Sequence, residues 1–249
     1  MSRNIETIIH GRMSAKEKAQ AWIFSIACLA GIIIAVVYLL FDEMDRRALY
    51  TGYAEAVIPV VSQIDHPFDA INAPVNVFEK PVMNVWPKNT WKKINLSDGL
   101  KSSITVMGQA KLQGRVYGVD LYHTSDLKYI SPVDISMGWQ DAATDHSFSN
   151  ISAKHGKRAA WFKVPRGLPG HQLTNTHLVP ADWSIYQVLK DAKPDDRIAL
   201  TAWPVTVRSM RVKPWASDLY FGDRNCEILL ITAVRLEKPD GSLRGEAYI

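Results

Sequence analysis

The stretch AWIFSIACLAGIIIAVVYLLF, residues 21–41, contains no charged side chain. A helix rises about 1.5 Å per residue, so this stretch reaches about 30 Å, the thickness of the hydrocarbon core of a bilayer. Trp22 lies at one boundary of the stretch and Tyr38 and Phe41 lie at the other, where aromatic rings favour the headgroup level. The sequence therefore predicts a transmembrane helix whose partner is the lipid bilayer.

A cleaved signal peptide is the alternative explanation of this stretch. The apolar core of a signal peptide is usually only about 7–15 residues long and is followed by a small-x-small cleavage site. Here the charged run DEMDRR, residues 42–47, follows instead. An uncleaved signal anchor is therefore favoured.

The basic residues near the span predict its orientation. Arg3, Arg12, Lys16 and Lys18 precede it, whereas only two arginines follow closely, beside three acids. Because short flanks rich in Lys and Arg stay on the cytoplasmic side, we expect a single-pass membrane protein with a cytoplasmic N-terminus, which lies in the inner membrane if the cell is a Gram-negative bacterium. The large C-terminal part is then periplasmic, or more generally extracytoplasmic.

Four segments follow from this reading. Residues 1–20 are expected to be a cytoplasmic segment, 21–41 the transmembrane helix, 42–64 a juxtamembrane helical stalk and 65–249 an exported β-rich domain. Apolar residues recur at helical spacing in the stalk, with Pro59 expected to kink or end it. The stalk could pack on a partner subunit or on its own domain, and the sequence leaves both open.

Composition restricts the classes to which the exported part can belong. The chain has 249 residues, of which 47% are hydrophobic and 22% charged, which is typical of a folded protein. Cys226 is the only cysteine beyond the span, so no intramolecular disulfide is expected there. The net charge of +4 is modest and evenly spread, and does not indicate nucleic-acid binding.

Alternating apolar and polar residues predict a mainly β domain with one or two helices. A Pro- and Asn-rich segment, residues 65–93, is expected to wrap on its surface, and a helix capped by Asp182 is expected over 181–192. Loops are expected over 165–180 and 213–225. The predicted strands cover 103–124, 128–137, 158–164, 197–208 and 227–237. This order favours an antiparallel sheet, either an OB-like barrel or a sandwich.

Several short motifs occur in a familiar order in this region. They are DISMGW at 134–139, RAAWF at 158–162, NTHLVPA at 175–181, DDRIAL at 195–200 and CEIL at 226–229. Over residues 100–237 the chain resembles a group of uncharacterised bacterial proteins with a short membrane anchor and an exported β-rich domain. The resemblance implies that architecture and no activity.

The sequence lacks several motifs of known catalytic chemistry. The sequence contains no Gly-x-Ser-x-Gly elbow, P-loop or His-Glu-x-x-His pattern. A metal site would have to combine His171 and His177 with a carboxylate such as Asp182 or Asp134. We therefore predict no catalytic set, no metal and no cofactor, and we expect Cys226 to be a small buried residue.

The tryptophans are the remaining candidates for contacts. Trp139, Trp161 and Trp203 lie within or beside predicted strands and are expected in the core. Trp86, Trp91 and Trp215 lie in loop-like surroundings, where aromatic rings can contact a partner or ligand.

Three hypotheses for function follow. The first is a non-enzymatic, membrane-anchored assembly or interaction protein of a bacterial envelope complex, which docks on other membrane or periplasmic subunits. The second is a periplasmic module that binds a glycan or a peptide through its loop tryptophans. The third is a membrane-tethered hydrolase acting through His171, His177 and Asp182.

Overall fold

A computed structural model describes residues 15–64, 74–96, 101–123, 126–156, 159–210, 213–222 and 226–249. Expectations that concern residues 1–14, including Arg3 and Arg12, and the first part of the Pro-rich segment, residues 65–73, lie outside the described residues. The chain forms two compact units, residues 1–45 and 46–249.

The first unit holds most of the long helix α1 (Ala15–Val61). The helix is long and apolar enough to cross a membrane. Between Trp22 and Phe41 its large apolar side chains, Tyr38 among them, are all exposed. A helix that exposes apolar side chains on every face is the kind that a bilayer accommodates.

The last turns of α1 belong to the second unit and pack on it. Arg46, Tyr50, Tyr53 and Val57 follow one another at steps of four, three and four residues, so they share one helix face, and all four are buried. The Tyr53 hydroxyl donates to the carbonyl oxygen of Tyr129 at 2.7 Å. Of the two possibilities left open for the stalk, the structure has the helix packed on its own domain, and the helix ends two residues after Pro59.

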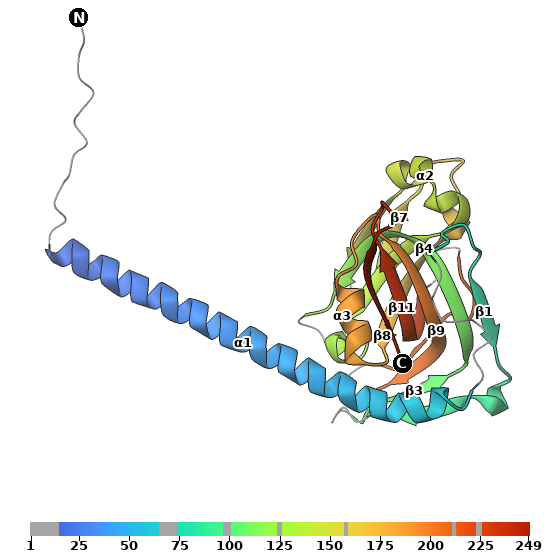
Figure 1. Cartoon of the computed structure of the whole chain (residues 1–249), viewed down its shortest axis with the longest axis horizontal. Helices are drawn as coiled ribbons and strands as arrows, with labels where there is room; N and C mark the ends of the chain where they lie inside the picture. The colour runs from blue at the N-terminus through green and yellow to red at the C-terminus, as the bar shows by residue number, and fades with distance from the viewer. Residues whose placement is uncertain are drawn as a thin grey trace, which may run out of the picture. The chain divides into compact units, whose positions relative to one another are not determined.

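The second unit is built around one ten-stranded sheet (Figure 1). Its strands are β1 (Val82–Val85), β2 (Lys92–Asn95), β3 (Ser103–Val106), β4 (Gly108–Leu121), β5 (Val133–Gly138), β8 (Leu173–Pro180), β9 (Arg197–Arg208), β10 (Trp215–Ala216), β11 (Cys226–Glu237) and β12 (Leu243–Tyr248). A separate hairpin is formed by β6 (Ser152–Gly156) and β7 (Ala159–Lys163). The helices are α2 (Asp145–Asn150), α3 (Trp183–Lys190) and the 3-10 turns η1 (Lys88–Thr90), η2 (Asp126–Tyr129), η3 (Gln140–Ala143) and η4 (Gly170–Gln172).

Five of these strands close into a barrel. β4 pairs with β5, β5 with β8, β8 with β11, β11 with β9, and β9 again with β4. The β8–β11 pair is parallel and the other four are antiparallel, and α3 connects β8 to β9. This connectivity is that of an OB-type barrel. The fold class predicted from the sequence is therefore confirmed. Of the two arrangements that the sequence left open, the closed ring of strands is the barrel and not the sandwich.

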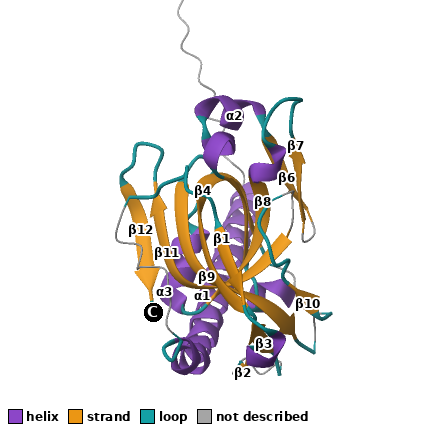
Figure 2. Ribbon diagram, turned by 90° about the vertical axis from the view of Figure 1, so that its right-hand side faces the viewer, coloured by secondary structure: helices purple, strands orange, loops and turns teal. Residues whose placement is uncertain are grey.

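Strand β4 closes the ring by pairing with both β9 and β5, and it can do so because it is long and irregular. Its first half pairs with β9 and its second half with β5, and the register with β5 shifts between Val116 and Gly118. A bulge of this kind bends a strand and increases its twist. Figure 2 shows the curled sheet, with α2 and the β6–β7 hairpin together at one end of it.

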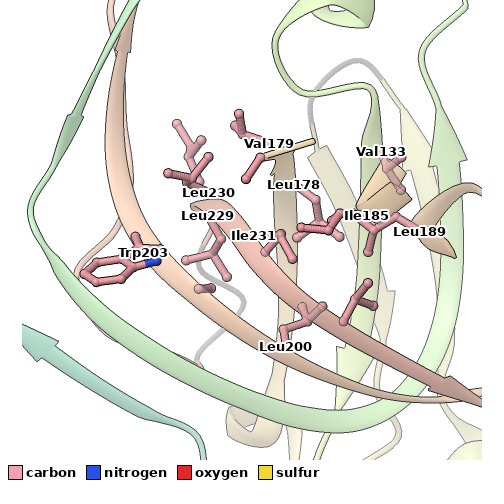
Figure 3. Packing of buried hydrophobic residues seen from close by; sticks show 14 of the residues in the cluster. Val133, Leu178, Val179, Ile185, Leu189, Leu200, Trp203, Leu229, Leu230 and Ile231 are labelled. Carbon is pink, nitrogen blue, oxygen red and sulfur yellow. The ribbon is translucent and has the colours of Figure 1, made fainter. Parts of the chain in front are cut away.

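The barrel interior is filled by one face of each strand. Leu112 lies opposite Leu200, and Leu178 lies opposite Val133 on one side and Leu229 on the other. All five side chains are fully buried. Figure 3 shows members of this cluster from β5, β8, β9 and β11, close to side chains of α3.

Two sequence predictions about this domain are wrong. Residues 165–180, expected to be a loop, contain the central strand β8. Trp161, expected in the core, is 59% exposed and lies on the hairpin, where its ring covers Gly156. By contrast, the strands predicted at 197–208 and 227–237 are confirmed as β9 and β11, and Trp139 and Trp203 are buried as expected.

The predicted helix start is also confirmed, and it allows a test. The Asp182 side chain accepts a hydrogen bond from the backbone nitrogen of Ile185 at 2.8 Å. Loss of such a cap typically costs about 1 kcal/mol. We expect Asp182→Ala to lower the free energy of unfolding by about that amount, whereas Asp182→Asn, which keeps an acceptor, should stay close to the wild type in urea titrations followed by tryptophan fluorescence.

Candidate functional site

A group of polar side chains, here called the polar cluster, lies on the outer face of the barrel. It consists of Asp134 and Ser136 on β5 and Asn175 and His177 on β8, and their side chains are buried. Asp134 lies opposite His177, and Ser136 lies opposite Asn175. Since successive strand residues point to opposite faces, all four point away from the hydrophobic interior. On an OB-type barrel this is the face that commonly binds ligands.

An acid and a histidine form the inner part of the polar cluster. Asp134 Oδ1 lies 2.6 Å from His177 Nδ1, and the Tyr122 hydroxyl donates to Asp134 Oδ2 at 2.6 Å. Both carboxylate oxygens are therefore used. The second ring nitrogen of His177, Nε2, is buried and has no hydrogen-bond partner among the described residues.

A serine and a second histidine form the outer part of the polar cluster. Ser136 Oγ lies 2.7 Å from His155 Nε2 and 3.2 Å from Asn175 Oδ1. His155 comes from β6, so the β6–β7 hairpin lies over this part of the face. Burial lowers the pKa of His155, against the opposing effects of the carboxylates of Asp134 and Asp120. The neutral imidazole is therefore favoured at neutral pH.

The segment that contains β10 covers the other side of the polar cluster. The Trp215 ring meets the His177 ring edge to face, with 4.2 Å between centroids. Beside them, burial and the carboxylates of Glu227 and Asp218 raise the pKa of the Cys226 thiol to about 11. A thiol with so high a pKa is a poor nucleophile at neutral pH.

The arrangement contains groups used in catalysis but gives a substrate no access to them. A serine hydroxyl beside a neutral histidine is the pairing that activates a nucleophile. However, Ser136 is fully buried, and the hairpin and Trp215 cover the face on which it lies. In this conformation the polar cluster joins β5, β8 and the covering segments, and does not form an open active site.

A glycine makes the approach of the hairpin possible. A Cβ atom added at Gly118 would lie 2.7 Å from Cε1 of His155. Gly118→Ala should therefore displace His155 from Ser136 and destabilise the domain by about 1–3 kcal/mol. Urea titration compares this variant with Gly170→Ala, where an added Cβ atom would make only ordinary contacts with Val164, the nearest at 3.5 Å, so that variant should stay close to the wild type.

A second site, here called the arginine cleft, is open to solvent. It has a volume of about 330 Å³ and lies between the outer face of β4 and β9, the segment 75–78 and the residues that connect η3 to α2. Its lining residues are Val75, Asn76, Val77, Phe78, Arg115, Ala143, Thr144, Asp145 and Arg197. The segment 75–78 is fixed there because Val77 packs with Ala143 and Ala199.

Arg115 is held in place on the floor of the arginine cleft. Its Nε donates to Asp195 Oδ1 at 2.5 Å, and its Nη1 lies 2.7 Å from Asp145 Oδ1 and 3.1 Å from the carbonyl oxygen of Ala143. Its guanidinium carbon also lies 4.1 Å from the centre of the Phe148 ring. Most of its donors are therefore satisfied within the protein.

Arg197 lies directly opposite Arg115 across the β4–β9 pair. Its guanidinium group has no hydrogen bond or ion pair within the part of the chain that the structure describes. On the other side of β9 it faces Glu237, whose two carboxylate oxygens are occupied by the Nε of Arg235 and the backbone nitrogen of Val75. The arginine cleft thus contains one unpaired cation.

The three tryptophans chosen from the sequence are not gathered in one site. The Trp86 ring packs edge to face on Trp203, and Trp91 Nε1 donates to the carbonyl oxygen of Trp86 at 3.0 Å. Trp215 covers the polar cluster, and all three chosen rings are partly buried. None of them lines the arginine cleft. Their role in contacts with a partner or ligand stays a prediction.

The residues of the hydrolase hypothesis have separate positions. His177 pairs with Asp134, Asp182 caps α3, and His171 is exposed in η4. Within the described ranges, no three His, Cys, Asp or Glu side chains are arranged to hold a metal ion.

Ser136, Asn175 and the two arginines were not predicted as site residues. Asn175 was missed because β8 was predicted to be a loop. Ser136 lies on β5, within a predicted strand, where a single serine gives no signal of a site. Arg115 and Arg197 are far apart in the sequence and meet only through the β4–β9 pairing. Comparisons with protein families, with characterised proteins and with solved structures found no match.

Proposed function

We propose that this is a non-enzymatic, single-pass membrane protein whose barrel is a docking module for another subunit of a bacterial envelope complex. In this proposal the N-terminus is cytoplasmic and the barrel lies on the extracytoplasmic side. The Lys and Arg residues before the span support this orientation. A reporter fused after Ile249 that is active only outside the cytoplasm would agree with it, and activity in the cytosol would refute it.

The observation that carries the docking function is the unpaired guanidinium group of Arg197 in an open cleft. Arginine side chains are enriched at the centres of protein interfaces, because their planar donors form several hydrogen bonds at once. The groups of the polar cluster, in contrast, are covered by the chain itself. Binding rather than catalysis is therefore the activity that the accessible residues support.

Purification in mild detergent tests the proposal. We expect the full chain to elute in size-exclusion chromatography with a co-purifying partner, and Arg197→Gln to reduce the amount of that partner at least tenfold. Arg208→Gln is the matched control, because Arg208 lies on the same strand, is exposed and does not line the arginine cleft. A wild-type protein that elutes as a lone monomer would refute the docking function.

A further inference from the structure

We infer that the arginine cleft binds a carboxylate group of a partner polypeptide together with an apolar side chain next to that carboxylate. This inference rests on the proposed docking function and adds the chemistry of the partner. Three features of the arginine cleft lead to it, namely its charges, the geometry of its donors and its apolar wall.

The ion pairs around the arginine cleft leave one guanidinium group, that of Arg197, without a partner among the described residues. Asp195 and Asp145 both pair with Arg115, and Glu237 pairs with Arg235. Arg197 remains without an ion-pair partner among the described residues, although it lies opposite another arginine. A bound carboxylate would supply the ion pair that Arg197 lacks.

A carboxylate fits this position better than a phosphate does. A planar carboxylate can accept two parallel hydrogen bonds from one guanidinium group and carries a single negative charge, which matches the one unpaired cation. A phosphate group carries about −1.5 to −2 at neutral pH. The additional charge would lie beside Asp145, whose side chain also lines the arginine cleft.

The apolar wall of the arginine cleft indicates what accompanies the carboxylate. Val75, Val77 and Phe78 line it together with Ala143. Phe78 is 60% exposed although it is a large aromatic residue, so its ring is available to a ligand. Covering the exposed ring would remove apolar surface from water, which favours binding. A leucine-sized side chain beside the carboxylate would use this wall.

Small capped peptides test the inference with the full chain in detergent micelles. The probes are acetyl-alanyl-leucine as the free acid, the same dipeptide as its amide, acetyl-leucyl-glutamic acid α-amide, in which only the side-chain carboxylate of the glutamic acid is free, and inorganic phosphate. Each probe is titrated separately. Saturation-transfer NMR gives the dissociation constants. We expect at least one free carboxylate peptide to bind at least tenfold more tightly than the dipeptide amide.

Two variants connect binding to the arginine cleft. Arg197→Gln should weaken binding of the carboxylate peptides at least tenfold and leave the melting temperature unchanged, because its guanidinium group has no hydrogen bond or ion pair in the described part of the chain. Phe78→Ala should weaken binding several-fold through the apolar wall. Arg208→Gln should bind the peptides as the wild type does. Whichever of the two carboxylate peptides binds more tightly shows whether the arginine cleft prefers the carboxylate of a chain terminus or that of an acidic side chain.

Three results would overturn the inference. They are equal binding of acid and amide, unchanged peptide binding to Arg197→Gln, and binding of phosphate that is tighter than that of both carboxylate peptides. Peptide binding without any co-purifying partner would support the inference while refuting the proposed docking function, so the two failures can be told apart.

Discussion

Replacing Asp134 with alanine is expected to lower the free energy of unfolding of the barrel by about 2–5 kcal/mol. The change removes the acceptor of both the His177 Nδ1–H group and the Tyr122 hydroxyl. His177 is fully buried, so water cannot take the place of the carboxylate without rearrangement. A buried polar group left without its partner costs far more than the partnered group contributes.

Chemical denaturation of the full chain in detergent, followed by tryptophan fluorescence, measures this effect. Asp141→Ala is the control, because Asp141 is exposed and its side chain makes no hydrogen bond within the described residues, and its effect should stay within about 0.5 kcal/mol. Tyr122→Phe should cost about 1 kcal/mol. An Asp134→Ala variant as stable as the control would show that the polar cluster does not hold the barrel together.

The stability of the barrel should fall as pH rises through neutrality, because of Glu227. This residue is fully buried and lies opposite Thr176 on the interior face of β11. Burial raises the pKa of its carboxyl group to about 8, although a hydrogen bond from Thr174 opposes the shift. Its second oxygen, Oε1, has no partner in the described part of the chain.

The sign of the effect follows from proton binding. Between the unfolded pKa of 4.5 and the folded pKa of about 8, the folded state holds a proton that the unfolded state has lost. Stability contributed by this proton is complete below the lower value and is lost as pH rises to the upper one, by up to about 1.4 kcal/mol per pH unit.

Urea titrations at a series of pH values from 5 to about 9 check this prediction. Glu227→Gln keeps the shape and can still accept a hydrogen bond from Thr174, but it cannot ionise. The variant should therefore be more stable than the wild type at pH 9. The difference between the two proteins isolates Glu227, since His155 titrates in both. Parallel stability curves across this pH range would contradict the raised pKa.

The sequence predicted the parts of the fold in which local pattern and environment agree. β9 and β11 are rich in β-branched and apolar residues, and α3 has an aspartate cap before an apolar stripe. The prediction missed β8 because polar side chains lie on both faces of this strand. Thr174 and Thr176 point into the barrel, and Asn175 and His177 point into the polar cluster. A strand that is polar on both sides carries no alternation of hydrophobicity.

The candidate site was less predictable, for a related reason. The polar cluster depends on the register between β5 and β8, and the arginine cleft depends on the register between β4 and β9. Each combines residues separated by about 40 to 80 positions in the sequence. The position of Trp161 was wrongly predicted because an aromatic residue in an apolar run was assumed to lie in the core. It lies instead on the two-stranded β6–β7 hairpin, which covers the polar cluster from outside the barrel.

The helical residues 46–57 decide where the chain can be cut to separate the barrel from the apolar part of α1. Their tyrosines fill space inside the folded domain, so a protease that cut between Val57 and the first strand would remove part of the core with the anchor. Only a cut on the N-terminal side of Arg46 would leave all of these buried side chains with the barrel. Shedding of the domain, if engineered, should therefore be directed at residues 42–45.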